Sequence, residues 1–374
     1  MQVDYVHIAN DRSLNGQVVH ARCSNKHKIH RTHHLCTSGW GRGHKKHTND
    51  NMFTYGQDAF SIAEDAITVA DGHGVEGDQV AMFACEAAMN LPKPLPKDIM
   101  CQPRLVERDL RDSVEQIVRG APQERGGATL VHMMFVQEGQ RRWVITVNVG
   151  DSEALLLYRN RVHVCSVAHS WDNLEVYRRY EHICPEPRDV CYNRWNAGKH
   201  KLKDSSGEYK PIHLYTRSKN GISTLHQPNA MFMKHLHERK RRPDLRYGTQ
   251  STRIPSSIHE NWGSSVLVHG RARGQVMASV GDHAERALTG VPYDLIHVYI
   301  HEVPPDERVV AVVQTDGIVH ERTLRECGSI GWSCGNAKRY LEDIRHPRDD
   351  MAAAMAIWEP NPRKTTPYQV PINI

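Results

Sequence analysis

Apolar and polar positions alternate through several separate stretches of the chain, and this alternation predicts most of its strands. The stretch QDAFSIAEDAITVADG, residues 57–72, contains two short apolar runs joined by the acidic turn AED. A period of two over such short runs is typical of β-strands. From Ala128 to Ala168 the same period recurs between the turn sequences EGQ, GDS and RNR, which predicts an antiparallel meander.

Two stretches instead have apolar residues at the three- and four-residue spacing of a helix. The first is EGDQVAMFACEAAMNL, residues 76–91, which follows a glycine-rich turn. The second is LVERDLRDSVEQIVRGA, residues 105–121, and we expect this helix to end at Gly120. Both stretches predict amphipathic helices that lie against the strands.

The remaining pattern sets the expected domain organisation. Residues from about 175 to 265 show few regular periods and contain charged clusters such as HERKRRPD, so we expect an irregular insertion there. Apolar runs return in GQVMASVGD, DLIHVYIHEV, RVVAVVQTDGIV and MAAAMAIW. Strands in meanders with a few helices between them predict an α+β fold. We place the domain at 51–360, after a basic, His/Cys-rich N-terminal extension at 1–50 and before a C-terminal tail at 361–374.

Composition narrows the class of protein. The chain has 374 residues, of which 39% are hydrophobic and 24% charged, the balance of a globular protein with a sizeable core. A net charge of +5 is small for this length and argues against a nucleic-acid-binding protein. No apolar stretch approaches the about 20 residues of a membrane helix, and no secretory signal is visible. Nine cysteines without a CxxC pair favour a reducing compartment, so we expect an intracellular protein, cytoplasmic or nuclear. We also expect it to be a monomer.

Aspartates stand at the ends of several predicted strands. Carboxylates in such positions are costly unless a partner offsets their lost hydration. Oxygen ligands with no cysteine among them favour Mg²⁺ or Mn²⁺ over zinc. Asp-Gly is also among the commonest turn dipeptides, and a single Asp-Gly after a strand is far more often a turn than a metal site, so each aspartate taken alone is weak evidence. The residues are Asp58, Asp71, Asp151, Asp316, Asp349 and Asp350.

Several motifs in one order strengthen the metal interpretation. They are DGHG at 71–74, GGATLV at 126–131, NVGDS at 148–152, MASVGD at 277–282, TDG at 315–317 and DD at 349–350. In this order they resemble the metal-dependent serine/threonine protein phosphatases of the type 2C family, also called the PPM family. The resemblance covers residues 55–180 and 275–358. It implies an αββα sandwich, in which two packed antiparallel β-sheets are flanked by helices.

The resemblance also implies a set of metal ligands. Asp71 would bridge two Mn²⁺ or Mg²⁺ ions at the catalytic centre, and the carbonyl of Gly72 would bind one of them. Asp316 and Asp349 would complete the protein ligands of the other ion. Two such ions lower the pKa of a bound water and offset charge on phosphoryl oxygens. The implied function is hydrolysis of phosphoserine and phosphothreonine in proteins by this water.

Other residues would support the reaction. Gln57 and Asp58 would act through metal-bound water, and Asp151 would help to hold a third ion. His73 would be the general acid, because an imidazole carries a proton near neutral pH and the leaving alkoxide needs one.

Some positions differ from the family pattern. His320 stands four residues after Asp316, where animal members carry a further aspartate, and Ala168 replaces the aspartate of a usual Asp-His pair. No arginine lies just before Gln57, where one would bind the substrate phosphate, and Arg42, farther upstream, is the candidate for that role. The alternative function is therefore a pseudophosphatase, which keeps the fold and binds phosphoproteins without hydrolysing them.

The stretch HARCSNKHKIHRTHHLC, residues 20–36, combines two cysteines with several histidines. Two thiolates and two imidazoles form a possible structural zinc site. A solvated basic segment explains the same composition, and both interpretations stay open.

Overall fold

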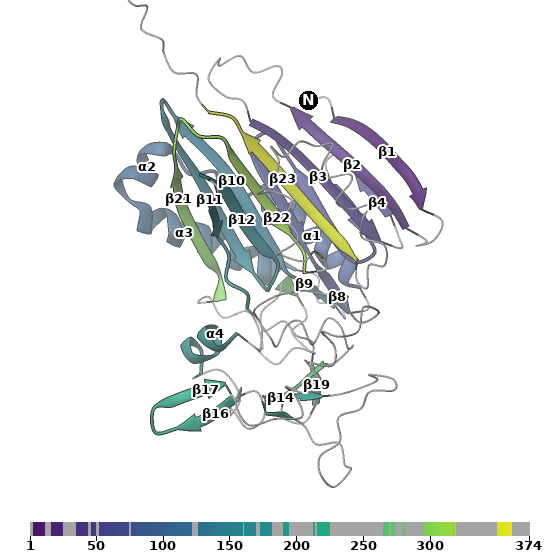
Figure 1. The fold of residues 1–374 in the computed structure, drawn as a ribbon, viewed down its shortest axis with the longest axis vertical. Helices are drawn as coiled ribbons and strands as arrows, with labels where there is room; N and C mark the ends of the chain where they lie inside the picture. Colours follow the sequence, from purple (N-terminus) through teal and green to yellow (C-terminus); the bar gives the residue numbers. More distant parts are fainter. Residues whose placement is uncertain are drawn as a thin grey trace, which may run out of the picture.

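Two antiparallel β-sheets of seven strands each form the centre of the protein (Figure 1). The computed structural model describes residues 3–11, 16–24, 35–43, 46–49, 52–74, 76–121, 126–159, 161–169, 173–181, 190–193, 212–213, 215–224, 265–268, 271–273, 280–281, 295–316, 318 and 350–360. The first sheet, sheet A, has the strand order β1 (Val3–Asp11), β2 (Gly16–Ser24), β3 (Leu35–Gly43), β23 (Met351–Trp358), β22 (Val309–Gln314), β12 (Glu153–Tyr158) and β13 (Arg161–Val164). Sheet B has the order β21 (His297–Val303), β11 (Arg141–Val149), β10 (Leu130–Glu138), β7 (Ala66–Ala70), β6 (Asp58–Ile62), β5 (Met52–Tyr55) and β4 (Lys46–Asn49).

The core between the two sheets is made by alternate residues of their facing strands. On β23 these residues are small, apart from Trp358 at the end of the strand: Ala352, Ala354 and Ala356 are fully buried in the same apolar cluster as Ile67 of sheet B. The intervening residues of β23 are buried as well, so this strand is covered on both faces. Burial on both faces explains why MAAAMAIW is a continuous apolar run rather than an alternating one.

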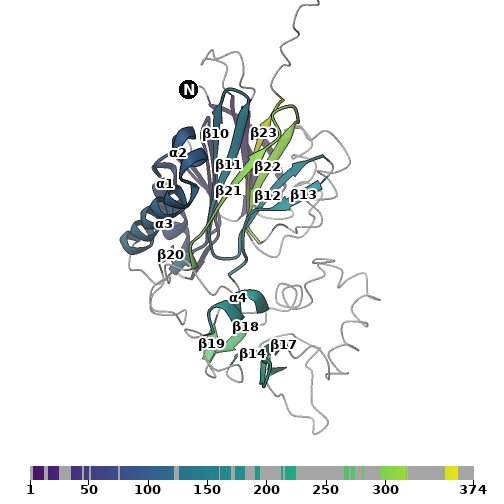
Figure 2. The same ribbon diagram turned by 90° about the vertical axis from the view of Figure 1, so that its left-hand side faces the viewer.

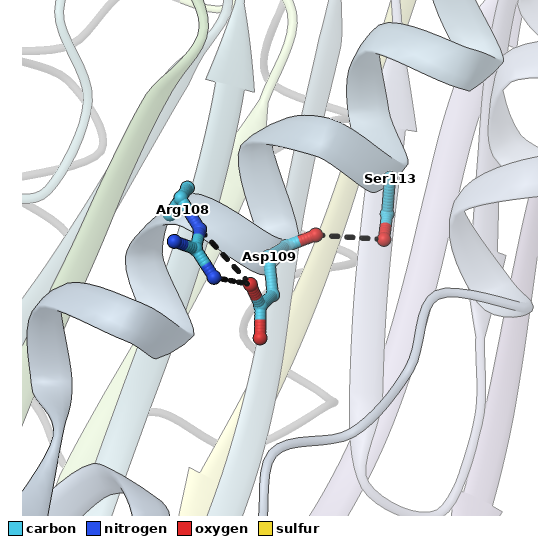
Figure 3. Close-up of polar contacts among 3 residues, drawn as sticks. All are labelled: Arg108, Asp109 and Ser113. Atoms are coloured by element: carbon cyan, nitrogen blue, oxygen red, sulfur yellow. Dashed lines mark hydrogen bonds and ion pairs between the residues drawn. The ribbon is translucent and has the colours of Figure 1, made fainter.

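Three helices cover the outer face of sheet B (Figure 2). They are α1 (Gly77–Met89), α2 (Pro96–Cys101) and α3 (Pro103–Gly120). On α3 the buried side chains recur every three or four residues and pack in a second core, between the helices and sheet B. They are Val106, Leu110, Val114, Ile117 and Val118. The opposite face of α3 is polar: exposed Arg108 pairs with Asp109, whose carbonyl accepts a hydrogen bond from Ser113 Oγ at 2.8 Å (Figure 3). This division is what an amphipathic surface helix requires.

These elements confirm the predicted α+β fold class with two packed antiparallel sheets. The predicted strand pair at 57–72 is β6 and β7, and the predicted helices are α1 and α3. The stretch predicted as one meander forms two hairpins instead, β10–β11 in sheet B and β12–β13 in sheet A. The later apolar runs supply β20 (Val280–Gly281), β21, β22 and β23. The described helices flank sheet B, and residues 319–349, between β22 and β23, lie outside the described part of the chain.

The N-terminal residues contribute more than an extension. Strand β3 pairs with β23 along its whole length, from Leu35 opposite Trp358 to Arg42 opposite Met351, and β1 and β2 continue sheet A outward. Strand β4 pairs with β5 in sheet B. The pattern predicted no strands here because these segments are polar, and strands near a sheet edge need fewer apolar residues than central strands.

Short elements occupy the segment predicted to be irregular. They are α4 (Leu174–Arg179), the four-stranded sheet β15 (Ile212–His213), β14 (Val190–Asn193), β18 (Ser265–Val268) and β19 (Arg271–Arg273), and the hairpin β16 (Tyr215–Ser218) and β17 (Gly221–Thr224). Near the main sheets, β8 (Gly72–Gly74), β9 (Gly126–Ala128) and β20 form a third small sheet. None of the described helices is long and apolar enough to cross a membrane.

Candidate metal centre

The candidate site begins where β6 starts and β7 ends, at one edge of sheet B. These strands are antiparallel neighbours, and Ala59 lies opposite Ala70. Extending this register by one residue brings Asp58 opposite Asp71, so the two residues stand at the same edge. Asp58 is buried and Asp71 is partly buried. The strand pairing therefore places two of the predicted acidic residues together.

Thr129 holds the backbone of Asp71 in both directions. The Asp71 N–H donates to Thr129 Oγ1 at 2.9 Å, and the Thr129 N–H donates to the Asp71 carbonyl at 2.8 Å. Directly after Asp71, β8 pairs with β9, which places His73 opposite Gly127. The Gln57 side chain donates to the carbonyl of Gly74. The DGHG segment is thus fixed from both sides, with His73 partly buried between these contacts.

Gly72 is required by close packing. A Cβ atom at this position would lie 2.3 Å from the carbonyl oxygen of Gln57 and 2.4 Å from that of Gly77. Both of these atoms belong to the backbone and have no flexible side chain that can move aside. The DG sequence therefore does more than form a turn, because only glycine lets the Gln57 turn and the first residue of α1 approach the strand end this closely.

The hairpin between β11 and β12 brings Asp151 to this part of the molecule. Thr129 Oγ1 shares a hydrogen bond with Ser152 Oγ, 2.5 Å away, and both hydroxyl groups are buried. Gly150 packs directly on Thr129, since a Cβ there would lie 2.6 Å from Thr129 Cγ2. Asp151, which lies between Gly150 and Ser152 in the chain, is 8% exposed. Because Ser152 directly precedes β12 of sheet A and Asp71 directly follows β7 of sheet B, Thr129 joins the two sheets at this edge.

The end of β22 and the start of β23 reach the same edge. The Thr315 N–H donates to the Ala352 carbonyl at 3.0 Å, and Thr315 Oγ1 accepts from the Ala352 N–H at 3.0 Å, which places Asp316 beside the start of β23. At that start, Asp350 Oδ2 accepts a hydrogen bond of 2.9 Å from the Gln57 N–H. This contact links the last strand of sheet A to the turn that precedes Asp58.

Most of the predicted site residues lie at this shared edge, on segments joined by the contacts above. They are Gln57, Asp58, Asp71, Gly72, His73, Asp151 and Asp316. Asp349 lies outside the described residues. The backbone of Arg42 lies opposite Met351, so β3 carries the candidate phosphate-binding residue to the edge where β23 begins. Within the described ranges, no three His, Cys, Asp or Glu side chains come close enough together to hold one ion.

Two residues of this region have a larger part than the sequence suggested. Asp350, the second aspartate of the DD pair, contacts the Gln57 turn, whereas the resemblance assigned the ligand role to Asp349. Thr129 appeared only as part of the GGATLV motif, yet it contacts both Asp71 and Ser152. The DD pair and the threonine of GGATLV were visible in the sequence, but neither motif indicates which residue its side chain contacts.

The donor set fits a hard divalent cation in kind. Carboxylate oxygens with one close backbone approach at Gly72 are the ligands that Mg²⁺ and Mn²⁺ prefer. The nearby thiol of Cys85 does not compete: burial raises its pKa, and the charge of Asp58 adds to this effect. A thiol that stays protonated is a poor metal ligand.

Solved structures of bacterial serine/threonine phosphatases are similar to this chain. The structure of PstP/Ppp from Mycobacterium tuberculosis is 13% identical over 87% of this chain and 99% of its own, with a TM-score of 0.44. Stp1 from Staphylococcus aureus is 12% identical over 86% and 93%, with a TM-score of 0.44. A catalytic domain of PstP in complex with two manganese ions is 13% identical over 87% and 99%, with a TM-score of 0.43.

No protein-family model matches the chain, and no curated protein matches it by sequence. With TM-scores below 0.5 and identities near 13%, the likeness to solved structures carries no weight for the activity.

Proposed function

We propose that this protein is a divergent metal-dependent phosphatase of the type 2C family that hydrolyses phosphoserine and phosphothreonine in proteins. What supports the proposal is the meeting of separate acidic strand ends at one edge of the sandwich. The N-terminal halves of β6, β12 and β23 and the C-terminal ends of β7 and β22 all reach this edge. Five separate chain segments thus end at one edge, and an aspartate stands at the end of each. A purely structural arrangement would gain nothing from their mutual repulsion.

Under this proposal each residue has a defined task. Asp71, the carbonyl of Gly72, Asp316 and Asp349 would hold the Mn²⁺ or Mg²⁺ ions. Bound ions of this kind lower the pKa of a water towards neutrality and offset charge on the phosphoryl oxygens. Asp350 holds the Gln57 backbone and so positions Asp58 rather than binding an ion itself.

Four further residues act around this centre. Gln57 and Asp58 would orient water at the bound ions, and Asp151 would help to hold a third ion. His73 donates a proton to the oxygen of the leaving serine or threonine. His73 directly follows the two residues that would hold the metal ions, so its imidazole is well placed to act as the general acid.

Hydrolysis of p-nitrophenyl phosphate with and without Mn²⁺ tests the proposal, together with the variant Asp71→Asn. A neutral amide does not bridge two cations as a carboxylate does, so we expect this variant to lose activity at saturating Mn²⁺. Asp65→Asn is the matched control. Asp65 lies at the other end of β7, where it forms an exposed ion pair with Lys93 that contributes little, so this variant should keep full activity.

Activity of Asp71→Asn within a few-fold of wild type would exclude this metal centre. If wild type does not hydrolyse the substrate with either ion but still binds a phosphothreonine peptide, the protein is a pseudophosphatase instead.

A further inference from the structure

A buried histidine lies against the turn that carries Asp151. His169 is fully buried, and its backbone N–H donates to the Gly150 carbonyl at 2.9 Å. In return the Gly150 N–H donates to the ring nitrogen Nδ1 of His169 at 3.0 Å. One residue therefore bonds both the donor and the acceptor of the Gly150 backbone.

Gly150 needs these partners because it has left the sheet. Strand β11 ends at Val149, and Gly150 has a φ of +98°, in the left-handed region that glycine adopts readily. Gly150 is buried, and a buried backbone N–H requires an acceptor. The ring nitrogen of His169 supplies the acceptor that a neighbouring strand would otherwise provide.

Asn148 joins the same two segments. Its Nδ2 donates to the Gly150 carbonyl at 3.2 Å and to the Val167 carbonyl at 3.1 Å. Its Oδ1 accepts from the Val167 N–H at 2.9 Å. Asn148 is fully buried, so these bonds are shielded from water. The end of β11 and the segment that ends at His169 are thus one hydrogen-bonded unit.

A second histidine fixes the ring of His169 from its other side. Because Nδ1 accepts from a backbone N–H, the proton of the neutral ring is on Nε2. This nitrogen lies 2.7 Å from Nδ1 of His297, the first residue of β21, which faces Asn148 across the β11–β21 pair. Burial, with His297 and Arg179 nearby, holds the pKa of His169 well below its ordinary value, in agreement with a neutral ring.

The residue before His169 contributes through its backbone. The carbonyl of Ala168 accepts from Asn173 Nδ2 at 2.7 Å, and Asn173 also caps α4 through its Oδ1. Neither this contact nor the contacts of His169 involve a side chain at position 168. Alanine in place of the usual aspartate therefore leaves the bonds between His169 and Gly150 intact.

We infer that His169 is a positioning residue for Asp151. In the chain, Asp151 stands between Gly150, which His169 holds, and Ser152, which Thr129 holds. With both neighbours fixed, the Asp151 carboxylate is presented in one place, and a preorganised ligand binds an ion more tightly than a mobile one. The ligand role of Asp151 belongs to the proposed function, on which this part of the inference rests.

Two conservative substitutions separate the two sides of the His169 ring. The side-chain oxygen of asparagine takes the place of Nδ1 and can accept from the Gly150 N–H. The amide group of glutamine instead reaches the place of Nε2 and can keep the contact with His297. His169→Asn therefore retains the bond that the inference requires, and His169→Gln loses it.

The first experiment measures the Gly150 amide without any metal. The full chain, kept in EDTA and labelled with ¹³C in valine carbonyls and ¹⁵N in glycine, gives paired signals from Gly150 and Gly281 only, since these glycines alone follow a valine. Gly281, on β20, is the internal reference. We expect the Gly150 amide to exchange with solvent about tenfold faster in His169→Gln than in wild type, and within a few-fold of wild type in His169→Asn. Equal exchange in all three proteins would overturn the inference.

The second experiment measures Mn²⁺ binding directly, from the electron paramagnetic resonance signal of free Mn²⁺. Wild type is compared with Asp151→Asn, His169→Gln and the double variant. If His169 acts through Asp151, each single variant raises the dissociation constant of the weakest bound ion about tenfold, and the double variant binds no more weakly than Asp151→Asn. Losses that multiply in the double variant would overturn the inference.

His132→Gln controls for a general loss of structure. His132 is similarly buried but contacts Thr68 rather than the turn, so this variant should bind Mn²⁺ as wild type does. A shift as large as that of His169→Gln would assign the effect to stability and overturn the positioning role. A wild-type protein that binds no Mn²⁺ would instead refute the proposed metal centre, and the amide exchange would still decide whether His169 holds the turn.

Discussion

At the scale of single residues, Gly72 shows how closely the candidate site is packed. Two backbone carbonyls, from Gln57 and Gly77, lie where its Cβ would be. A methyl group there must displace either the turn before Asp58 or the start of α1. We therefore expect Gly72→Ala to lower the free energy of unfolding by about 1–3 kcal/mol, the usual cost of overpacking. Urea denaturation measures this difference.

Gly120→Ala is the control for that experiment. Gly120 ends α3, and a Cβ there would meet only Phe83 Cζ at 3.9 Å among nearby atoms. Alanine also has the higher helix propensity, so this variant should be as stable as wild type or slightly more stable. Equal stability of Gly72→Ala and wild type would show that the backbone around Gly72 has room to move.

The role of His73 is also a question at the residue scale. If it protonates the leaving oxygen, its loss matters most when that oxygen is a poor leaving group. His73→Gln should slow hydrolysis of a phosphothreonine peptide by roughly 10²–10⁴. The p-nitrophenolate anion leaves without a proton, so hydrolysis of p-nitrophenyl phosphate should fall much less. Equal losses on both substrates, or a large shift in the Mn²⁺ requirement, would exclude the acid role.

At the scale of elements, Thr129 joins the end of β7 to the start of β12. Its hydroxyl accepts a hydrogen bond from the Asp71 N–H and shares one with the Ser152 hydroxyl. The side chains of Thr129 and Ser152 are both buried. Thr129→Val keeps the shape of the side chain but leaves the Asp71 N–H without its acceptor. We expect a loss of about 1–3 kcal/mol in unfolding free energy and a higher Mn²⁺ concentration for half-maximal activity.

Thr129→Ser separates the hydroxyl from the methyl group. It keeps the bonds to Asp71 and Ser152 but loses the methyl that packs on Gly150. Its Mn²⁺ requirement should therefore stay near that of wild type even if its stability falls. A shift as large as that of Thr129→Val would assign the effect to packing rather than to the hydrogen bonds.

At the scale of the whole molecule, the helices over sheet B bury a histidine, and this burial makes the stability of the domain depend on pH. His132 on β10 is 1% exposed, and its Nδ1 lies 2.8 Å from Thr68 Oγ1, which in turn contacts Met89 of α1. Burial lowers the pKa of His132 to about 4, with Asp65 opposing the shift. Protonation of this ring would therefore place a charge in the buried layer between α1 and sheet B.

The sign of the pH effect follows from that lowered pKa. An unfolded chain binds the proton below about pH 6.5, whereas the folded protein binds it only near pH 4. Stability is therefore unaffected by His132 above about pH 6.5 and falls as the pH drops from 6.5 to 4, by up to about 3 kcal/mol. Urea denaturation across this range should show a shallower decline for His132→Gln. Identical slopes for the two proteins would mean that His132 titrates normally in the folded state.

Much of the fold and part of the candidate site could be predicted from the sequence. The periods of two and 3.6 residues are local properties, so β6, β7, β10 to β13, α1 and α3 could be found from them. The order of the acidic motifs was visible for the same reason. The strands β1 to β3 were not, because their polar residues hide the alternation of an outer strand.

Contacts between distant segments were decided only by the tertiary structure. His169 and His297 are 128 residues apart, and Gln57 and Asp350 are 293 apart. Which of two adjacent aspartates meets the Gln57 turn depends on the register of β23 against β3 and β22, and no local pattern contains that register. The sequence by itself determined most of the central strands and helices and which carboxylate residues are candidates for a metal site. The packing of sheet A on sheet B determined which of those residues meet, because only packed sheets bring separate strand ends to one edge.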